Sequence, residues 1–143
     1  MTVSYLVDTN TISELLRPEP ASHVVTLFHQ NEDRIATASI VWHELIFGAR
    51  RLPPSKKRTR LETFLFDVLQ PTIPILPYDS KAAKWHGEER ARLTADGRPP
   101  TFADGQIAAI AATNGLTVVT RNTSDFAVFP GITVENWMEK AEE

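Results

Sequence analysis

Short apolar segments alternate with longer amphipathic segments along most of the chain. Segments rich in Val, Ile, Tyr and Thr predict strands at 4–7, 34–38, 73–76, 117–120 and 132–134. Between them, apolar residues recur at three- and four-residue spacing, which predicts helices at 11–16, 21–30, 39–51, 56–68, 79–93 and 101–114. This alternation predicts an α/β fold, in which helices cover a parallel sheet on both of its faces.

Several residues mark where these elements begin and end. Thr11 and Glu14 have the spacing of a capping box, which predicts that the first helix begins at Thr11. Ser39 is a candidate N-cap for the third helix, and Gly115 is placed to end the last one. Pro74 interrupts the third strand, so we expect that strand near an edge of the sheet.

The composition fits one globular domain. The chain has 143 residues, 42% hydrophobic and 23% charged, and no repeat or long linker divides it, so we expect a single domain over residues 1–143. It has no cysteine, which excludes disulfides and thiolate metal sites and is compatible with the cytoplasm. The sequence has neither an apolar run long enough for a membrane span nor a basic segment before the first apolar stretch, so we expect no membrane span and no signal peptide.

The distribution of charge is more informative than its sum. The formal net charge is -3, which does not by itself indicate a nucleic-acid partner. Yet six of the 15 basic residues fall within 11 positions, namely Arg50, Arg51, Lys56, Lys57, Arg58 and Arg60. Such a segment suits either the guidance of a phosphate chain or simple solvation, and both interpretations stay open.

Four carboxylates lie where predicted strands end or on helices beside those ends. Asp8 follows the first strand directly, and Asp125 follows the fourth strand after a short polar run. Glu44 lies among apolar neighbours of the third helix, so we expect it to be partly desolvated. Asp104 lies in the first turn of the last helix, on the face that we expect to meet the sheet. Sites in open parallel sheets lie beyond the carboxyl ends of the strands, so convergence of the four is predicted.

Each of these acids also has a purely structural interpretation. Asp8 suits a helix N-cap, and Asp104 has approximately the capping-box spacing from Thr101. Glu44 suits an exposed position or an ion pair with Arg51, and the fourth acid suits an ordinary polar turn. The functional interpretation therefore depends on the four acting together.

Converging carboxylates require protons or cations, because like charges at close range cannot all stay ionised unaided. Without cysteine, and with four histidines that lack zinc-site spacing, the ligands are oxygens, which favours Mg²⁺ or Mn²⁺. Such a site activates water against phosphodiesters, and the absence of P-loop and GxGxxG motifs disfavours nucleoside triphosphate chemistry. A nucleic-acid backbone is the remaining natural substrate. Arg17, Arg98 and Arg121 lie in loops beside the acids and are candidate phosphate contacts.

Four segments carry a resemblance to a known family. They are VDTNTISELLR at 7–17, SIVWHELIFGA at 39–49, FADGQIAAIAATNGLTVVTRNTSDF at 102–126 and ITVENW at 132–137. In this order they resemble the PIN domain, and within it the VapC-type toxins of bacterial type II toxin–antitoxin pairs, including the FitB-like branch. The resemblance covers nearly the whole chain.

The resemblance implies a three-layer α/β/α sandwich with a central, mainly parallel sheet and Mg²⁺- or Mn²⁺-dependent endoribonuclease activity. By position, the catalytic and metal-binding acids would be Asp8, Glu44, Asp104 and Asp125, with Asp8 and Asp104 as direct metal ligands. Thr120 and Asn122 would support the site. Gly105 stands where the family more often has Ala, a departure that we expect to loosen the helix by a fraction of ~1 kcal/mol.

The resemblance also implies partners. A homodimer would be silenced by a cognate VapB-like antitoxin, which combines a DNA-binding region with a tail over the cleft, and the two would form a larger assembly on DNA. Two alternatives stay open: a non-enzymatic module that binds RNA or forms complexes, and a metal phosphoesterase that acts on DNA or small phosphates. The sequence does not identify the RNA.

Overall fold

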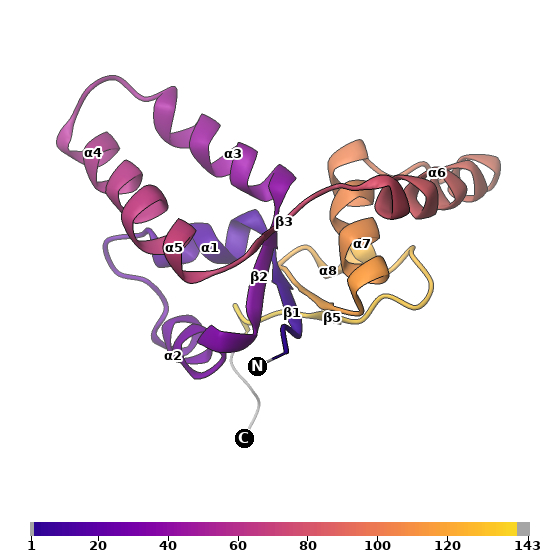
Figure 1. The fold of residues 1–143 in the computed structure, drawn as a ribbon, viewed down its shortest axis with the longest axis horizontal. Helices are drawn as coiled ribbons and strands as arrows, with labels where there is room; N and C mark the ends of the chain where they lie inside the picture. Colours follow the sequence, from indigo (N-terminus) through magenta and orange to yellow (C-terminus); the bar gives the residue numbers. More distant parts are fainter. Residues whose placement is uncertain (1, 140–143) are drawn as a thin grey trace.

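The computed structural model describes residues 2–139, so the extreme ends of the predicted domain lie outside the described residues. Its centre is a five-stranded sheet made of β1 (Tyr5–Val7), β2 (Ile35–Ala38), β3 (Ile75–Leu76), β4 (Thr117–Val119) and β5 (Val134–Glu135). The spatial order is β3-β2-β1-β4-β5, and every neighbouring pair is parallel (Figure 1). The predicted α/β/α class with a central parallel sheet is confirmed, and β3 is an edge strand as Pro74 indicated.

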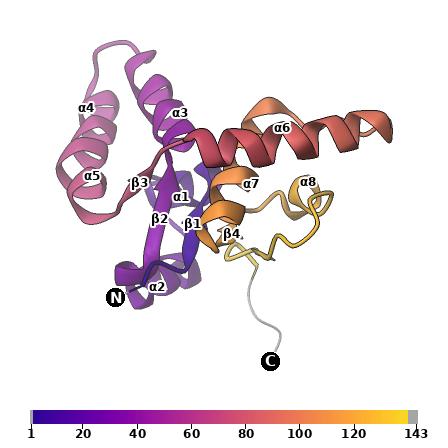
Figure 2. The ribbon, with the colours of Figure 1, turned by 45° about the vertical axis from the view of Figure 1, so that its right-hand side comes forward.

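Helices connect and cover the strands. They are α1 (Thr9–Leu15), α2 (Ser22–Gln30), α3 (Ser39–Arg50), α4 (Lys56–Thr63), α5 (Gln70–Thr72), α6 (Ser80–Ala95), α7 (Phe102–Asn114) and α8 (Thr123–Phe126). In Figure 1 the sheet separates the α3–α5 side from α6 and α7, and Figure 2 shows α6 lying across α7. The short helix α8 was not predicted, because its four residues are too few to show a period.

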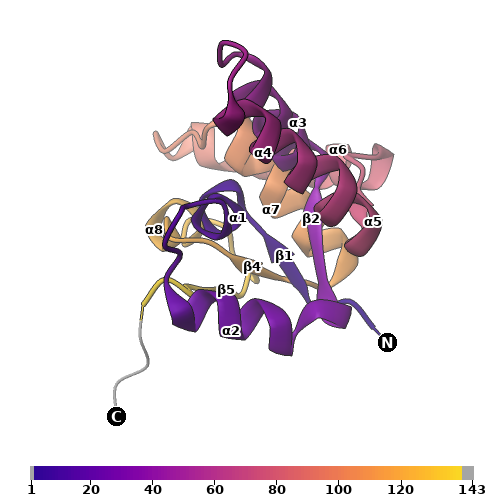
Figure 3. The same cartoon turned by 90° about the vertical axis from the view of Figure 1, so that its left-hand side faces the viewer.

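The predicted helix at 56–68 continues further than its apolar spacing indicated. After α4, the chain forms the π-helical segment η2 (Phe64–Leu69) and then α5, and together they make one arm beside α3 (Figure 3). A one-turn 3-10 segment, η1 (Glu32–Arg34), precedes β2. No helix within residues 2–139 combines the length and the apolar character that a bilayer crossing requires.

Two predicted helix starts are wrong. α1 begins at Thr9 rather than Thr11, because Asp8 is its N-cap and accepts a hydrogen bond of 2.7 Å from the Thr9 N–H. Thr11 is instead fully buried within the helix. Ser39 is the first residue of α3 rather than its cap, and Ala38 in the cap position offers no side-chain hydrogen bond.

Both ends of α7 agree with their predictions. The Thr101 hydroxyl accepts a hydrogen bond of 3.2 Å from the Asp104 N–H at the start of the helix. At its other end, Gly115 adopts the left-handed conformation with φ 68°, which glycine accepts without steric cost. α7 is therefore anchored on both sides of the segment that carries Asp104.

The core lies where β1 and β4 meet the flanking helices. Leu6, Val7, Val118 and Val119 are completely buried, as expected for central strands of a parallel sheet covered on both faces. The register pairs Val7 with Thr37 on one side and with Val119 on the other. Residues that follow these strands therefore emerge together at one edge of the sheet.

Candidate functional site

Asp8 and Thr120 follow the neighbouring strands β1 and β4 and meet at that edge. The Thr120 hydroxyl donates a hydrogen bond of 2.9 Å to an Asp8 carboxylate oxygen. Both side chains are buried, with exposed fractions of 7% for Asp8 and 0% for Thr120. The capping bond from the Thr9 N–H occupies the other carboxylate oxygen, so Asp8 is fixed from two sides.

Asn10 completes a polar network around this pair, and the sequence reasoning did not select it. Its side-chain amide donates to the Thr120 hydroxyl at 3.3 Å and to Asp8 at 3.5 Å. Its carbonyl oxygen accepts from the Arg121 N–H at 3.0 Å, and the Asn122 N–H donates to the Thr120 hydroxyl at 3.1 Å. The available signal was its place two residues after Asp8, on the first turn of α1.

A pocket of about 240 Å³ opens over this network. Its lining brings together three of the predicted acids, Asp8, Glu44 and Asp104, from the start of α1, from α3 and from the start of α7. Asn122 also lines it. The fourth acid, Asp125 of α8, lies close enough for its charge to act on both Asp8 and Asp104. Three of the four predicted acids thus line one pocket, and Asp125 lies outside its lining.

Burial makes ionisation of the two inner acids unfavourable. It is the largest cause that raises the pKa of Asp8, against the hydrogen bonds from Thr9 and Thr120, and the charge of Asp125 raises it further. Burial is also the largest cause that raises the pKa of Asp104. The hydrogen bond with Thr101 lowers that pKa, and the charges of Asp125 and Asp8 raise it. The pocket therefore favours a bound positive charge.

Glu44 is exposed, which corrects the expectation of a partly desolvated carboxylate. The buried face of α3 consists of Val41, Leu45 and Ala49, and Glu44 lies beside this face. It makes no ion pair with Arg51 or with any other residue between positions 2 and 139. Its carboxylate is therefore free to face the pocket that it lines.

The donor chemistry of the pocket fits a hard divalent cation. Within residues 2–139, no three acidic or histidine side chains stand close enough together to ligate one ion. Mg²⁺ does not require such a cage, because it keeps several waters and binds proteins through one or two carboxylates together with substrate phosphates. The inner pair, Asp8 and Asp104, supplies two carboxylates that repel each other.

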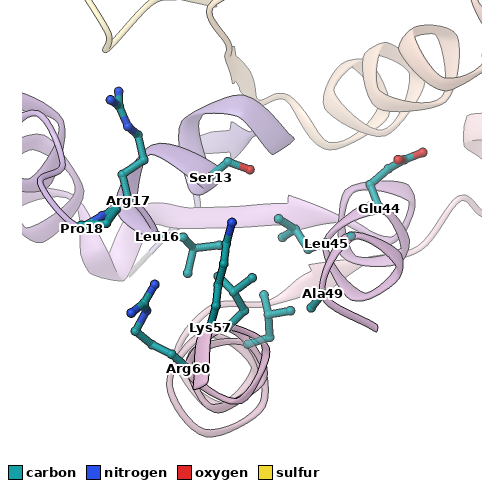
Figure 4. A pocket seen from close by; sticks show the side chains of 12 residues that line it. Ser13, Leu16, Arg17, Pro18, Glu44, Leu45, Ala49, Lys57 and Arg60 are labelled. Atoms are coloured by element: carbon teal, nitrogen blue, oxygen red, sulfur yellow. The ribbon is translucent and has the colours of Figure 1, made fainter. Parts of the chain in front are cut away.

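A second pocket, of about 440 Å³, adjoins the acidic pocket at Glu44 (Figure 4). Four leucines line it: Leu16, which caps the end of α1, Leu45 of α3, Leu61 of α4 and Leu65 of η2. Arg17 extends from the end of α1, and Lys57 and Arg60 extend from α4 (Figure 4). This pocket combines an apolar floor with a cationic rim.

The basic residues of the segment at 50–60 have two kinds of surroundings: some are held in ion pairs and others line the second pocket. Arg50 of α3 pairs with Glu62 of α4 at 3.3 Å, which links the two helices, whereas Arg58 pairs with the same Glu62 at 2.6 Å within α4. Lys57 and Arg60 instead line the second pocket. Ion pairing of Arg50 and Arg58 matches neither interpretation of this segment, and phosphate guidance by Lys57 and Arg60 stays a prediction.

The three predicted phosphate contacts have different surroundings. Arg17 lines the second pocket and lies 3.2 Å from the buried carboxylate of Glu14, a residue that the sequence reasoning did not select. A hydrogen bond from the Ala21 N–H is the main cause that lowers the pKa of Glu14. The same hydrogen bond ties α1 to the loop that follows it.

Arg98 lines neither pocket and lies 3.7 Å from Asp96. Arg121 is exposed and adjoins Asn122 at the rim of the acidic pocket.

Comparison with known proteins gives one consistent result. The PIN domain profile matches residues 5–131. The chain is 35% identical over 136 residues to the tRNA(fMet)-specific endonuclease VapC of Salmonella typhimurium, covering 94% of this chain and 98% of the relative. It is 37% identical over 125 residues to Toxin FitB of Neisseria gonorrhoeae, covering 85% and 89% of the two chains.

Solved structures agree with the sequence comparison. The structure of FitAB bound to the IR36 DNA fragment matches with a TM-score of 0.87 at 30% identity, covering 96% of this chain and 98% of that one. The crystal structure of DNA-bound VapBC from Salmonella typhimurium matches with a TM-score of 0.83 at 33% identity, covering 94% and 98%. The PIN match over residues 5–131 includes all four predicted acids.

Proposed function

This chain belongs to the PIN-domain family, and from that membership we propose that it is a Mg²⁺-dependent endoribonuclease, the toxin of a type II toxin–antitoxin pair. Relatives that match it over nearly their full length are named VapC endonucleases or ribonucleases. The observation that carries the proposal is the pocket in which Asp8, Glu44 and Asp104 meet beyond the strand ends. Hydrolysis of an RNA phosphodiester is the reaction that this site would catalyse.

We assign Asp8 and Asp104 as the carboxylates that hold the cation directly, with Mn²⁺ as an alternative ion of similar ligand preference. Both are partly or fully removed from water, and burial and neighbouring charge oppose their ionisation. When bound, a divalent cation lowers the pKa of a water molecule and offsets charge on a phosphate. Glu44 and Asp125 complete the catalytic set from its exposed side.

The residues of the chain divide the remaining tasks. Thr120 and the Thr9 N–H orient Asp8, and Asn10 and Asn122 brace the Thr120 hydroxyl. Glu44 carries an exposed carboxylate with no ion partner among residues 2–139. It is therefore placed to accept a proton from an attacking water at the pocket mouth.

We assign the cationic rim of the second pocket to the RNA backbone. Arg17, Lys57 and Arg60 lie beside a pocket that shares Glu44 with the acidic pocket, so a chain bound there continues towards the acids. Arg121 would contact a phosphate beside the acidic pocket, whereas Arg98 lines neither pocket and would add at most a weak, exposed contact. Because two relatives are named for tRNA(fMet), a tRNA is the substrate to test first.

We also propose the partners of the family for this chain: a VapB-like antitoxin, a toxin homodimer, and a toxin–antitoxin assembly on DNA in the cytoplasm. Solved relatives of at least 30% identity are toxin–antitoxin complexes, two of them bound to DNA. Such an assembly would keep the nuclease silent until the antitoxin is lost.

The test is incubation of the purified protein with a panel of tRNA, mRNA, single-stranded DNA and a small phosphodiester, with Mg²⁺ and after EDTA treatment. We expect Mg²⁺-dependent cleavage of RNA alone, at defined positions when the ends are mapped. RNA binding without cleavage would instead favour a non-enzymatic module, and cleavage of DNA or the small diester would favour a broader phosphoesterase.

A further inference from the structure

α6 crosses α7 (Figure 2), and the imidazole of His86 in α6 lies against Gly105 of α7. His86 has an exposed fraction of only 1%. Its Nδ1 shares a hydrogen bond of 2.8 Å with the Tyr78 hydroxyl, and the Tyr78 ring meets the imidazole edge-on. The other ring nitrogen, Nε2, is buried without a hydrogen-bond partner among residues 2–139. The imidazole is thus held by Tyr78 on one side and faces Gly105 with the other.

The imidazole fills the space that a side chain at position 105 would need. A Cβ atom on Gly105 would lie 2.6 Å from Cδ2 and 2.9 Å from Cε1 of His86, and would also collide with Nε2. Gly87, the neighbour of His86 in α6, has nothing within 4 Å of the corresponding position. Gly105 does not have a positive φ, so the contact rather than the backbone conformation requires glycine here.

This contact lies at the turn that carries a predicted metal ligand. Gly105 follows Asp104 directly, in the first turn of α7. His86 also touches that turn a second time, with its ring 5.0 Å from the ring of the half-exposed Phe102. Within residues 2–139, the only side-chain hydrogen bond of this turn is the cap, in which the Asp104 N–H donates to the Thr101 hydroxyl. His86 therefore supplies much of the packing that sets where the turn sits.

We propose that His86 is a positioning residue, which through its contact with Gly105 sets the placement of Asp104 relative to Asp8. The catalytic part of this inference rests on the proposed function, whereas the steric part does not. His86 and Gly105 act as a pair. A side chain at position 105 would clash with the imidazole, and loss of the imidazole beside Gly105 would leave a gap under the turn.

The test compares Gly105→Ala, His86→Ala and the double variant with the wild type, using Gly87→Ala as a matched control in open space. All are assayed well below their unfolding temperatures at saturating Mg²⁺. We expect Gly105→Ala to lower kcat by about 10²-fold, the loss typical of a ~1 Å misplacement, with KM changed by less than about twofold. The double variant should recover most of the lost kcat, and His86→Ala alone should lose only a few-fold.

A second readout does not depend on activity. Crystal structures of Gly105→Ala and the double variant should show the Asp104 backbone displaced from Asp8 in the first and restored in the second. Wild-type kcat in Gly105→Ala, or a double variant no better than Gly105→Ala in kcat or in Asp104 placement, would overturn the proposal. If Gly105→Ala does not fold, rescue of folding by His86→Ala supports the contact, and failure of that rescue overturns it. A wild type that does not cleave RNA would refute the proposed function, and the displacement of Asp104 would still decide the positional claim.

Discussion

The two pockets share Glu44 and differ in how their charges are held. In the acidic pocket, Asp8 is buried and fixed by hydrogen bonds from Thr9 and Thr120, where central strands end. In the second pocket, Lys57 and Arg60 project from a surface helix over leucines. The acids are thus held rigidly by hydrogen bonds, whereas the cations share an open surface, an arrangement that would suit contact with a long polyanion.

The largest effect should come from the acidic pocket. Asp8→Asn or Asp104→Asn removes one carboxylate of the proposed cation site, and we expect RNA cleavage to fall by about 10²–10³-fold, as for other losses of a preorganised charge. Cleavage of a fixed RNA with saturating Mg²⁺ measures this. Asp33→Asn, which changes an exposed acid in η1, is the control. Equal loss in the control, or undiminished cleavage in either site variant, contradicts the assignment.

The second pocket should affect binding more than the chemical step. Lys57→Ala combined with Arg60→Ala should raise KM by about tenfold while kcat changes little, because uniform binding is lost. The dependence of log K on log salt should also become shallower by about 0.7 for each lost phosphate contact with single-stranded RNA. Lys84→Ala, at an exposed lysine of α6 paired with Glu88, is the matched control. A fall in kcat without a change in KM would mean that the two pockets are not functionally distinct.

A third, smaller effect concerns stability. Because burial raises the pKa of Asp8, its contribution to stability is present at low pH and lost as pH rises through the folded-state pKa. Metal-free Asp8→Asn should therefore unfold at a higher temperature than the wild type at pH 7, and the difference should shrink as the solution is acidified. About 3–5 °C corresponds to ~1 kcal/mol for a chain of this size.

Calorimetry with and without Mg²⁺ sharpens this prediction. Mg²⁺ should raise the unfolding temperature of the wild type, because the ion binds only the folded protein, and should raise that of Asp8→Asn much less. A less stable Asp8→Asn at pH 7 would show that the carboxylate contributes more as a helix cap than it costs through burial.

The smallest effect is expected at Arg98. It lines neither pocket and lies near Asp96, so Arg98→Ala should change KM by less than about twofold, as for an exposed charge. Measurement of kcat/KM at two salt concentrations checks this. A larger loss would extend the RNA surface beyond the cationic rim.

The sequence was sufficient for the sheet, for the long helices and for three of the four acids that line one pocket beyond the strand ends. Alternation and end signals such as Gly115 are local, and parallel strands bring their carboxyl ends together by geometry alone. Asp8 was predicted either as a cap or as a site residue, and its structure unites the two: the carboxylate caps α1 and lines the pocket. The predicted catalytic roles themselves stay predictions.

What the sequence could not provide depends on long-range contacts. Glu44 is exposed because α3 buries the Val41–Leu45–Ala49 face, and a helix that is apolar on most sides does not reveal that choice. Asn10 gains its role only when β4 delivers Thr120 beside it. The consequence of Gly105 was likewise underestimated as a loss of helix propensity, because the partner that excludes a side chain there lies 19 positions away at His86.

The two outermost strands, β3 and β5, contain only two residues each. Unpaired main-chain groups on a sheet margin are a template on which other polypeptides can add and aggregate, and very short margins limit this hazard. The sheet of this chain thus offers almost no ladder for uncontrolled self-association. We therefore expect a specific partner to bind this chain mainly through side chains rather than by adding a strand to the sheet.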